Sequence, residues 1–284
     1  MRLLALDTST RYAGIALSSD DDVGSDYGEY TWHTGNNHNV DLLDSLRRLL
    51  AERDVTFQEL DGICVATGPG SFNGVRIAVA VAKTLAYTLG IPLLGISTLD
   101  VIAAQQRLTT QLLCATLEAG RGDLYAAYYQ MEQHVDEQGT LRFALTRLSD
   151  YLLLSPQELA NHASSLLATN EQSSQGTTRV HVLFCGERSV ASQQALRAAL
   201  PEQSLFVDRQ ASIRHASMLA ALGRQRLQAG QYDDPLLLEP LYLRRPSITA
   251  SSRKQSLLGP AGPGEQTIQQ SAVSPEREEG ALHH

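Results

Sequence analysis

A glycine-rich turn opens a long apolar segment, which reads ATGPGSFNGVRIAVAVAKTLAYTLG over residues 66–90. Its glycines are Gly68, Gly70 and Gly74. Backbone N–H groups at such a turn can hold a phosphate. The spacing misses G-x-G-x-x-G by one residue, and Val75-Arg76 follows where a P-loop needs Lys-Ser/Thr. The residues favour a strand-to-helix turn in which Ser71 or Asn73 caps the helix.

A second stretch that could do chemistry is LDTST, near the start of the chain. An acid at a strand end, followed by a hydroxyl-rich turn and a return strand, is similar to the first phosphate loop of actin-like ATPases and sugar kinases. Ser9 stands where that loop usually has glycine. We favour an Asx-type turn that closes a hairpin. The degenerate phosphate-loop positions are therefore Asp7, Thr8, Ser9, Thr10, Gly68 and Gly70.

Patterns for metal binding or nucleophilic catalysis are missing from the sequence. It contains no HxxxH, HExxH, GxSxG or CxxC pattern. Each of its three cysteines, Cys64, Cys114 and Cys185, lies in a short apolar run, which is typical of buried thiols in a reducing compartment.

Charge and hydropathy exclude some partners. The net charge is −8 and only two lysines are present, so the chain is a poor candidate for binding RNA without a partner. No window is apolar enough to cross a membrane, and the N-terminal RLLALD does not resemble a signal peptide. We expect a cytoplasmic protein.

These residues need a scaffold, and hydrophobic periodicity predicts one. We expect a strand pair (3–6, 14–17), a helix (40–54), a strand (62–67), a helix (73–89) and a strand (92–97). From about Thr110 the pattern restarts with another hairpin around a two-residue Arg-Gly turn. Helices at 155–167, 191–199 and 216–229 alternate with short strands, and 168–179 reads as a polar loop.

The repeated order predicts an α/β protein with two related lobes. We place an N-terminal lobe at 1–108 and a C-terminal lobe at 109–246, whose last helix can pack back on the first lobe. Residues 247–284 are rich in Ser, Gln, Gly and Pro and read as a disordered tail.

The helix over 73–89 is apolar around roughly 200° of its circumference, more than one core face needs. It is either sandwiched inside the domain or faces a second protein.

Four stretches together carry a resemblance: LLALDTSTRYAGIAL, VATGPGSFNGVRIAVAVAKTLAYTLGIPLLGISTLD, LEAGRGDLYAAYY and PLYLRR. Over residues 1–245 the chain resembles the TsaB (YeaZ) family. The resemblance implies a two-lobed actin-like (ASKHA, ribonuclease H-like) fold. It also implies a role in forming N6-threonylcarbamoyladenosine at position 37 of tRNAs that read ANN codons.

By the same resemblance, the chain is a non-catalytic subunit that pairs with a TsaD-like transferase and works with a TsaE-like ATPase. ATP, Mg²⁺ and metal then belong to those partners, and tRNA is bound only through the complex. Thr98 and Ile102 stand where TsaD-like proteins carry histidine ligands, and neither can replace one. Glu118 and Asp123 stand where the family usually has Asp and Glu, and NHN over 37–39 replaces its NHS.

The family pairs through two helices, here about 39–52 and 73–89, and a homodimer can use the same face. The implied interface residues are Leu42, Leu43, Leu46, Leu49, Leu50, Val75, Val79, Ala82, Leu85 and Ala86. An actin-like small-molecule kinase or ATPase is the alternative function, and a metallopeptidase a third, against which Thr98 and Ile102 argue.

Overall fold

The computed structural model describes residues 1–21, 24–34, 38–109, 111–135, 139, 141–173 and 181–244. Residues 1–246 form one compact unit. The predicted tail, 247–284, lies outside the described residues, so its disorder stays a prediction.

The first sheet has the strand order β3-β2-β1-β4-β5. β1–β2 and β2–β3 are antiparallel, whereas β1–β4 and β4–β5 are parallel. The strands are β1 (Arg2–Asp7), β2 (Tyr12–Asp21), β3 (Gly24–His33), β4 (Gly62–Ala66) and β5 (Leu93–Ile96). The helical segments along this part of the chain are α1 (His38–Glu52), η1 (Phe57–Glu59), α2 (Phe72–Leu89) and α3 (Thr98–Ala104).

The second sheet repeats this order as β8-β7-β6-β10-β11, with β9 paired to β7. It too joins an antiparallel hairpin to two parallel strands. Its strands are β6 (Leu112–Gly120), β7 (Asp123–Val135), β8 (Leu141–Arg147), β9 (Leu152–Leu154), β10 (Val182–Cys185) and β11 (Ser204–Phe206). Its helices are α4 (Pro156–Ser173), α5 (Val190–Ala199) and α6 (Ala216–Gln228).

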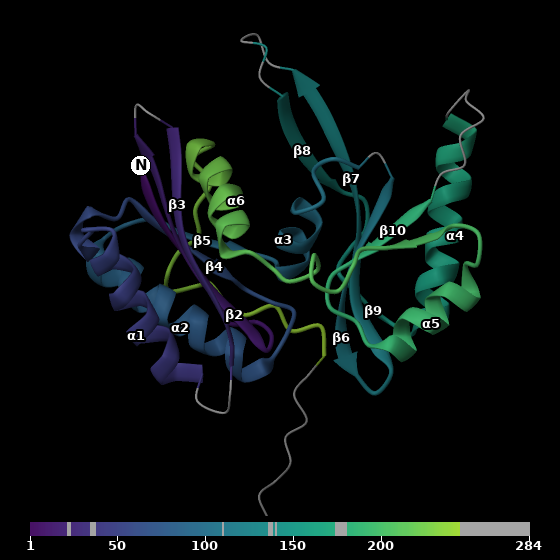
Figure 1. Cartoon of the computed structure of the whole chain (residues 1–284), viewed down its shortest axis with the longest axis horizontal. Helices are drawn as coiled ribbons and strands as arrows, with labels where there is room; N and C mark the ends of the chain where they lie inside the picture. The colour runs from purple at the N-terminus through teal and green to yellow at the C-terminus, as the bar shows by residue number, and fades with distance from the viewer. Residues whose placement is uncertain are drawn as a thin grey trace, which may run out of the picture. The chain divides into compact units, whose positions relative to one another are not determined.

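Each sheet has helices on both faces, which Figure 1 lets the reader follow. Successive residues of β1 point to opposite faces: Leu4 and Leu6 join the core under α1 and α2, whereas Leu3 and Ala5 join the core under α6. On the second sheet α4 and α5 cover one face and α3 covers the other. The last helix of each part of the chain thus packs on the other sheet.

The predicted α/β class and the predicted hairpin-first order of both sheets are confirmed. Three differences have physical reasons. β3 and β8 were not predicted, because as edge strands they carry polar residues and lack a long apolar run. α3 is only seven residues long, too short for a visible period. The predicted loop 168–179 is wrong at its start, since α4 continues to Ser173, and residues 174–180 lie outside the described part.

Within the described residues, no helix is long and apolar enough to cross a membrane.

Candidate functional site

The turn after β1 holds the predicted phosphate-loop residues. Asp7 is buried, with 3% of its surface exposed. Its Oδ1 accepts hydrogen bonds from the backbone N–H of Ser9 at 2.8 Å and from the Ser9 hydroxyl at 2.5 Å. A side-chain oxygen bonded to the N–H two residues on is an Asx-type turn, as the sequence favours.

The glycine-rich turn lies directly against this first turn. The N–H of Ser71 donates to the carbonyl oxygen of Ser9 at 2.6 Å. The Thr8 hydroxyl donates to the carbonyl oxygen of Gly74 at 2.6 Å. A Cβ at Gly70 or Gly74 would overlap the backbone of the first turn. The glycines therefore permit close approach of two chain segments, and Ser71 caps α2 by accepting from the N–H of Gly74, as predicted.

Arg214, in the segment before α6, closes the site. Its Nε donates to Asp7 Oδ2 at 2.8 Å, and its Nη1 donates to Glu187 Oε1 at 2.5 Å. Its Nη2 donates to Thr10 Oγ1 at 3.0 Å and to the Tyr12 carbonyl oxygen at 3.2 Å. Burial alone would lower the pKa of the Arg214 guanidinium, but the carboxylates of Asp7 and Glu187 outweigh it and raise that pKa. Arg214 is therefore a fixed cation.

A second hairpin faces the same region. Arg121 and Gly122 connect β6 to β7 with φ of 59° and 83°, which confirms the two-residue turn. Glu118, on β6, accepts a hydrogen bond at 2.6 Å from the N–H of Ser189, the residue that caps α5. A carboxylate of the chain thus sits at a helix N-terminus, the place where an anion could otherwise bind.

Some of these groups, among them Thr10 and Glu187, line a cavity of about 810 Å³, whereas Asp7 and Arg214 lie behind its wall. It is lined from both sheets and their connections, by residues that include Ser9, Arg11, Ser71, Glu118, Arg188 and Gln210.

An actin-like fold implies a nucleotide with a divalent cation in this cavity, and the residues present do not fit that pair. Asp7, the acid available for a cation, is engaged by Arg214 instead. The start of α5 is engaged by Glu118, and the turn before α2 is packed on the backbone of Ser9.

Thr98 and Ile102, which the sequence resemblance places where TsaD-like proteins carry histidine ligands, lie on α3. They are 0% and 2% exposed, and Ile102 packs on the second sheet. Among the described residues, no group of three or more His, Cys, Asp or Glu side chains is placed to hold a metal ion.

The three cysteines are free and buried, as the sequence indicates. Burial raises the pKa of the Cys64 and Cys185 thiols to about 12, which leaves them protonated and unreactive at neutral pH.

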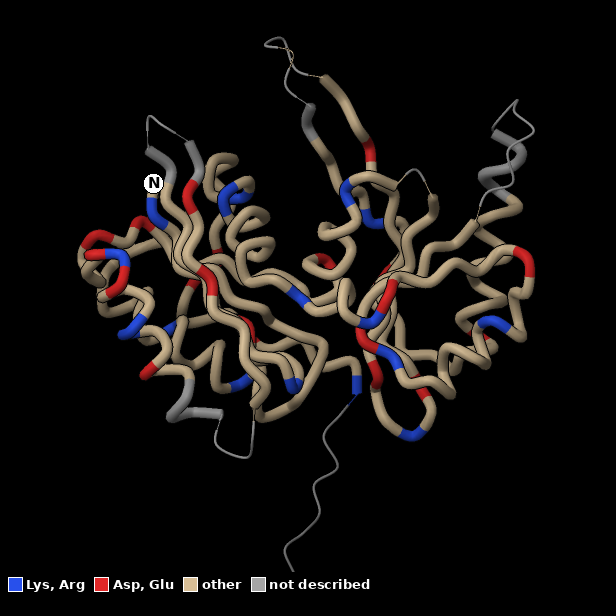
Figure 2. The backbone as a smooth tube through the Cα atoms, viewed as in Figure 1, with Lys and Arg blue, Asp and Glu red and all other residues tan. Residues whose placement is uncertain are grey.

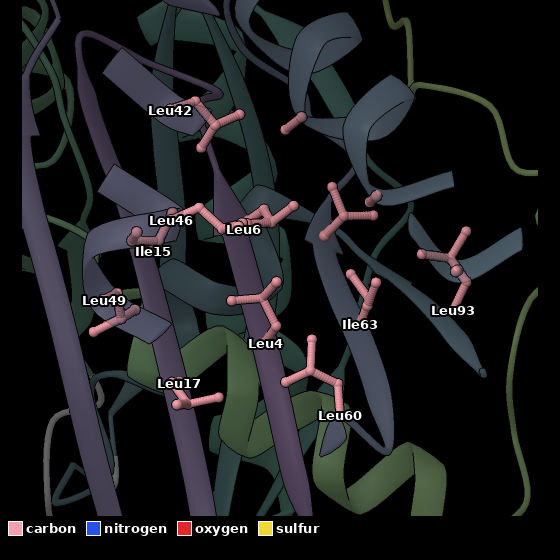
Figure 3. Packing of buried hydrophobic residues seen from close by; sticks show 14 of the residues in the cluster. Leu4, Leu6, Ile15, Leu17, Leu42, Leu46, Leu49, Leu60, Ile63 and Leu93 are labelled. Carbon is pink, nitrogen blue, oxygen red and sulfur yellow. The ribbon is translucent and has the colours of Figure 1, made fainter. Parts of the chain in front are cut away.

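The predicted interface residues need a correction. Leu43 is 47% exposed and Leu85 is partly exposed. The other eight are in the chain's own core, at most 4% exposed, because they face the first sheet: Leu42, Leu46, Leu49, Leu50, Val75, Val79, Ala82 and Ala86. Figure 3 shows Leu46 of α1 next to Leu6 of β1, in the cluster that also contains Leu42 and Leu49. Side chains placed this way cannot contact a partner; whether the two helices do so stays a prediction.

A different set of apolar side chains on and beside these helices faces outward. A C-terminal strap, residues 231–244, lies along α2, where the Lys83 ammonium donates to the carbonyl oxygens of Leu236 and Leu238. Among the side chains that the structure describes on α1, α2 and the strap, the large exposed apolar ones are Leu43, Phe72, Tyr87, Tyr232, Leu236, Leu237 and Tyr242. The Phe72 and Tyr242 rings lie 5.2 Å apart, so the start of α2 contacts the end of the strap.

Arg214 and Glu187 were not predicted from the sequence. Neither lies in a recognisable pattern: folding brings Arg214 to Asp7, 207 positions away, and Glu187 to Arg214. The sequence around Arg214, SIRHAS, is mixed in polarity and gives no local signal that the arginine is buried.

The two sheets share one strand order. The first sheet is covered by α6, which follows the second sheet in the chain, and the second sheet is covered by α3, which follows the first. This arrangement defines a protein of the actin-like class. The family model described as "TsaD: tRNA N6-adenosine threonylcarbamoyltransferase" matches residues 32–251, and the chain belongs to this family.

Individual relatives sharpen the comparison. The chain is 41% identical to the tRNA threonylcarbamoyladenosine biosynthesis protein TsaB of Bacillus subtilis over 138 residues, 49% of this chain and 59% of the relative. It is 29% identical to Escherichia coli TsaB over 136 residues, 47% of this chain and 57% of the relative. The chain thus spans less than two thirds of the length of either relative.

A solved structure agrees in fold. A Pseudomonas aeruginosa protein described as similar to peptidase YeaZ superposes with a TM-score of 0.64 at 24% identity, covering 86% of this chain and 99% of the other. The resemblance to TsaB (YeaZ) and the actin-like fold are confirmed.

Proposed function

We propose that this chain is a non-catalytic subunit in the biosynthesis of N6-threonylcarbamoyladenosine at position 37 of tRNAs that read ANN codons. In this proposal it binds a TsaD-type transferase and holds it in a competent form. Membership of the family and similarity to TsaB proteins support the pathway. The observation that carries the non-catalytic part is the buried ion pair between Asp7 and Arg214, which takes up the acid that a bound cation would need.

The alternative, a small-molecule kinase or ATPase, requires Asp7 to be free. ATP, Mg²⁺ and catalytic metal belong in our proposal to the TsaD-type and TsaE-type partners. Calorimetry with ATP and Mg²⁺ on the isolated chain separates the two functions. We expect no binding, whereas micromolar affinity with turnover would establish the alternative.

The proposed contact with the TsaD-type subunit uses the outward face of α1 and α2 together with the strap. Exposed large apolar side chains that gather on one surface are typical of protein–protein contacts. Leu43, Phe72 and Tyr87 supply the apolar centre, and Arg76, which lies 5.1 Å from the Phe72 ring centroid, adds a charge beside it. A homodimer through the same face is part of this proposal, since the transferase is a relative of the chain.

Co-purification tests this surface. The double variant Leu43→Glu/Tyr87→Glu alters only exposed side chains, so it should stay folded and lose the TsaD-type partner. Val190→Glu on α5 is the matched control, because Val190 is 57% exposed and lies away from the proposed face; it should retain the partner. Retention by the folded double variant would refute the assignment.

We propose that tRNA is held chiefly by the partners. The chain carries a net charge of −8, and Figure 2 shows acidic and basic segments interspersed over it. Few phosphates can be neutralised by such a surface. In a gel-shift assay the isolated chain should leave tRNA unshifted at 150 mM salt, while the complex should bind it. The reaction as proposed takes place in the cytoplasm.

A further inference from the structure

The Arg214 guanidinium lies between carboxylates that belong to different sheets. Asp7 ends β1 of the first sheet, and Glu187 follows β10 of the second. Thr10, in the first turn, also donates its hydroxyl to Glu187 Oε1 at 2.9 Å. Charge-assisted hydrogen bonds therefore connect the end of β1 to the segment after β10.

The three side chains of this ion-pair network are largely shielded from solvent. The side chains of Arg214 and Asp7 are 2% and 5% exposed, and that of Glu187 is 22% exposed. An ion pair withdrawn from water is held only when its geometry satisfies both partners, and its loss leaves an uncompensated buried charge. Because a guanidinium is a planar fork, its bonds fix the distance and angle between the two carboxylates.

We propose that Asp7, Arg214 and Glu187 form a clamp that holds the two sheets at one separation without any ligand. The Arg214 guanidinium takes the position that a divalent cation bound by Asp7 and Glu187 would occupy. The Glu118 carboxylate, which accepts from the N–H of Ser189, takes the place of a bound anion such as a phosphate at the start of α5. The chain thus supplies both charges of a cation–phosphate pair from its own side chains, and its cleft has no nucleotide-driven opening and closing.

A second ion pair bridges the same two parts of the molecule and gives a matched control. Arg244 of the strap pairs with Asp123 at the start of β7. Their side chains are 25% and 35% exposed, so water weakens this pair. The clamp proposal requires Arg214, and not Arg244, to set the separation.

The test measures that separation directly. Spin labels are placed at Gln58→Cys on η1 and Val190→Cys on α5, both exposed sites outside the proposed partner face. The native cysteines are buried, so labelling is selective. Electron paramagnetic resonance should give one narrow distance distribution for the parent and for Arg244→Ala, and a broad or shifted one for Arg214→Ala. Removing the buried partner should also lower Tm by about 10 °C, against less than about 4 °C for Arg244→Ala.

Two results would overturn the clamp: an Arg214→Ala distribution equal to that of the parent, or a parent distribution that shifts when Mg²⁺ and ATP are added. If Arg214→Ala does not fold, Glu187→Gln decides. It keeps an acceptor but removes the charge on the second sheet, so it should broaden the distribution, and an unchanged one would equally contradict the proposal. Since the isolated chain is measured, the outcome is independent of whether it binds a TsaD-type partner.

Discussion

Gly74 is a residue at which one methyl group decides the packing of two turns. Its Cα lies against the carbonyl oxygen of Thr8, which the end of β1 holds in place. We expect Gly74→Ala to reduce the free energy of unfolding by about 1–3 kcal/mol, the usual cost of overpacking. Asn73→Ala, one exposed position away, should change it by less than about 0.5 kcal/mol. Chemical denaturation measures both, and equal effects would show that the close approach does not matter.

Asp100 is a residue whose charge the fold disfavours. Its carboxylate accepts hydrogen bonds from the hydroxyls of Tyr129 at 2.7 Å and Tyr151 at 2.9 Å. Burial raises its pKa, against the lowering effects of those hydroxyls and of Arg147 and Arg226. The folded state therefore takes up a proton more readily than the unfolded state, and this contribution to stability is complete below the ordinary aspartate pKa and lost as pH rises through the raised pKa.

Asp100→Asn abolishes that titration. On going from pH 7 to about pH 4, the parent should gain stability relative to Asp100→Asn. Thermal melts of both proteins over this range measure the difference. Parallel curves would mean that the Asp100 carboxyl does not titrate differently in the folded state.

At the scale of elements, α2 shows what a wide apolar arc means. The side facing the first sheet carries Val79, which is 3% exposed, whereas Tyr87 near the end of the helix is 69% exposed. Val79→Glu buries an unpaired carboxylate and should cost more than about 4 kcal/mol, whereas Tyr87→Glu should cost less than about 0.5 kcal/mol. Urea denaturation of the two variants compares them, and a stable Val79→Glu would contradict the core position of this face.

The same helix marks the limit of sequence-based prediction. Its glycine start, serine cap and length are local features, and they were predictable within one residue. Which apolar side chains of α2 face the sheet depends on β1, β4 and β5, the strands that it packs on, and periodicity over a wide arc does not select them. β3 was missed for a related reason. Its hydrogen bonds to β2 hold it in place, and although Tyr30 and Trp32 pack against the core, they do not form an apolar run that the sequence would show.

The candidate site also contains residues that could be predicted from local sequence and residues that could not. Asp7, Ser9 and Gly70 were found because neighbouring residues formed a recognisable turn. Arg214 comes to Asp7 only through the topology of both sheets, over a separation of 207 residues. No local pattern encodes such a pair. The sequence therefore identifies Asp7 as a candidate but does not predict that Arg214 pairs with it.

At the scale of the molecule, the crossing helices make the two sheets depend on each other. α6 covers Leu3, Ala5 and Cys64 on the first sheet, and α3 covers Leu113 and Ala115 on the second. The lobe boundaries predicted from sequence, 1–108 and 109–246, stay predictions. A cut at that boundary separates each helix from the sheet that it covers.

Residues 1–108 expressed alone should therefore expose the face of the first sheet that α6 covers, and residues 109–246 the face that α3 covers. Bare apolar faces of this kind prevent independent stability. We expect neither fragment to melt cooperatively, their mixture to recover a folded complex, and the full chain to unfold in one transition. Calorimetry and amide spectra distinguish these states. A fragment of residues 1–108 that gave dispersed amide signals and its own cooperative melt would show that α6 is dispensable to the first sheet, and that the two sheets are separate folding units.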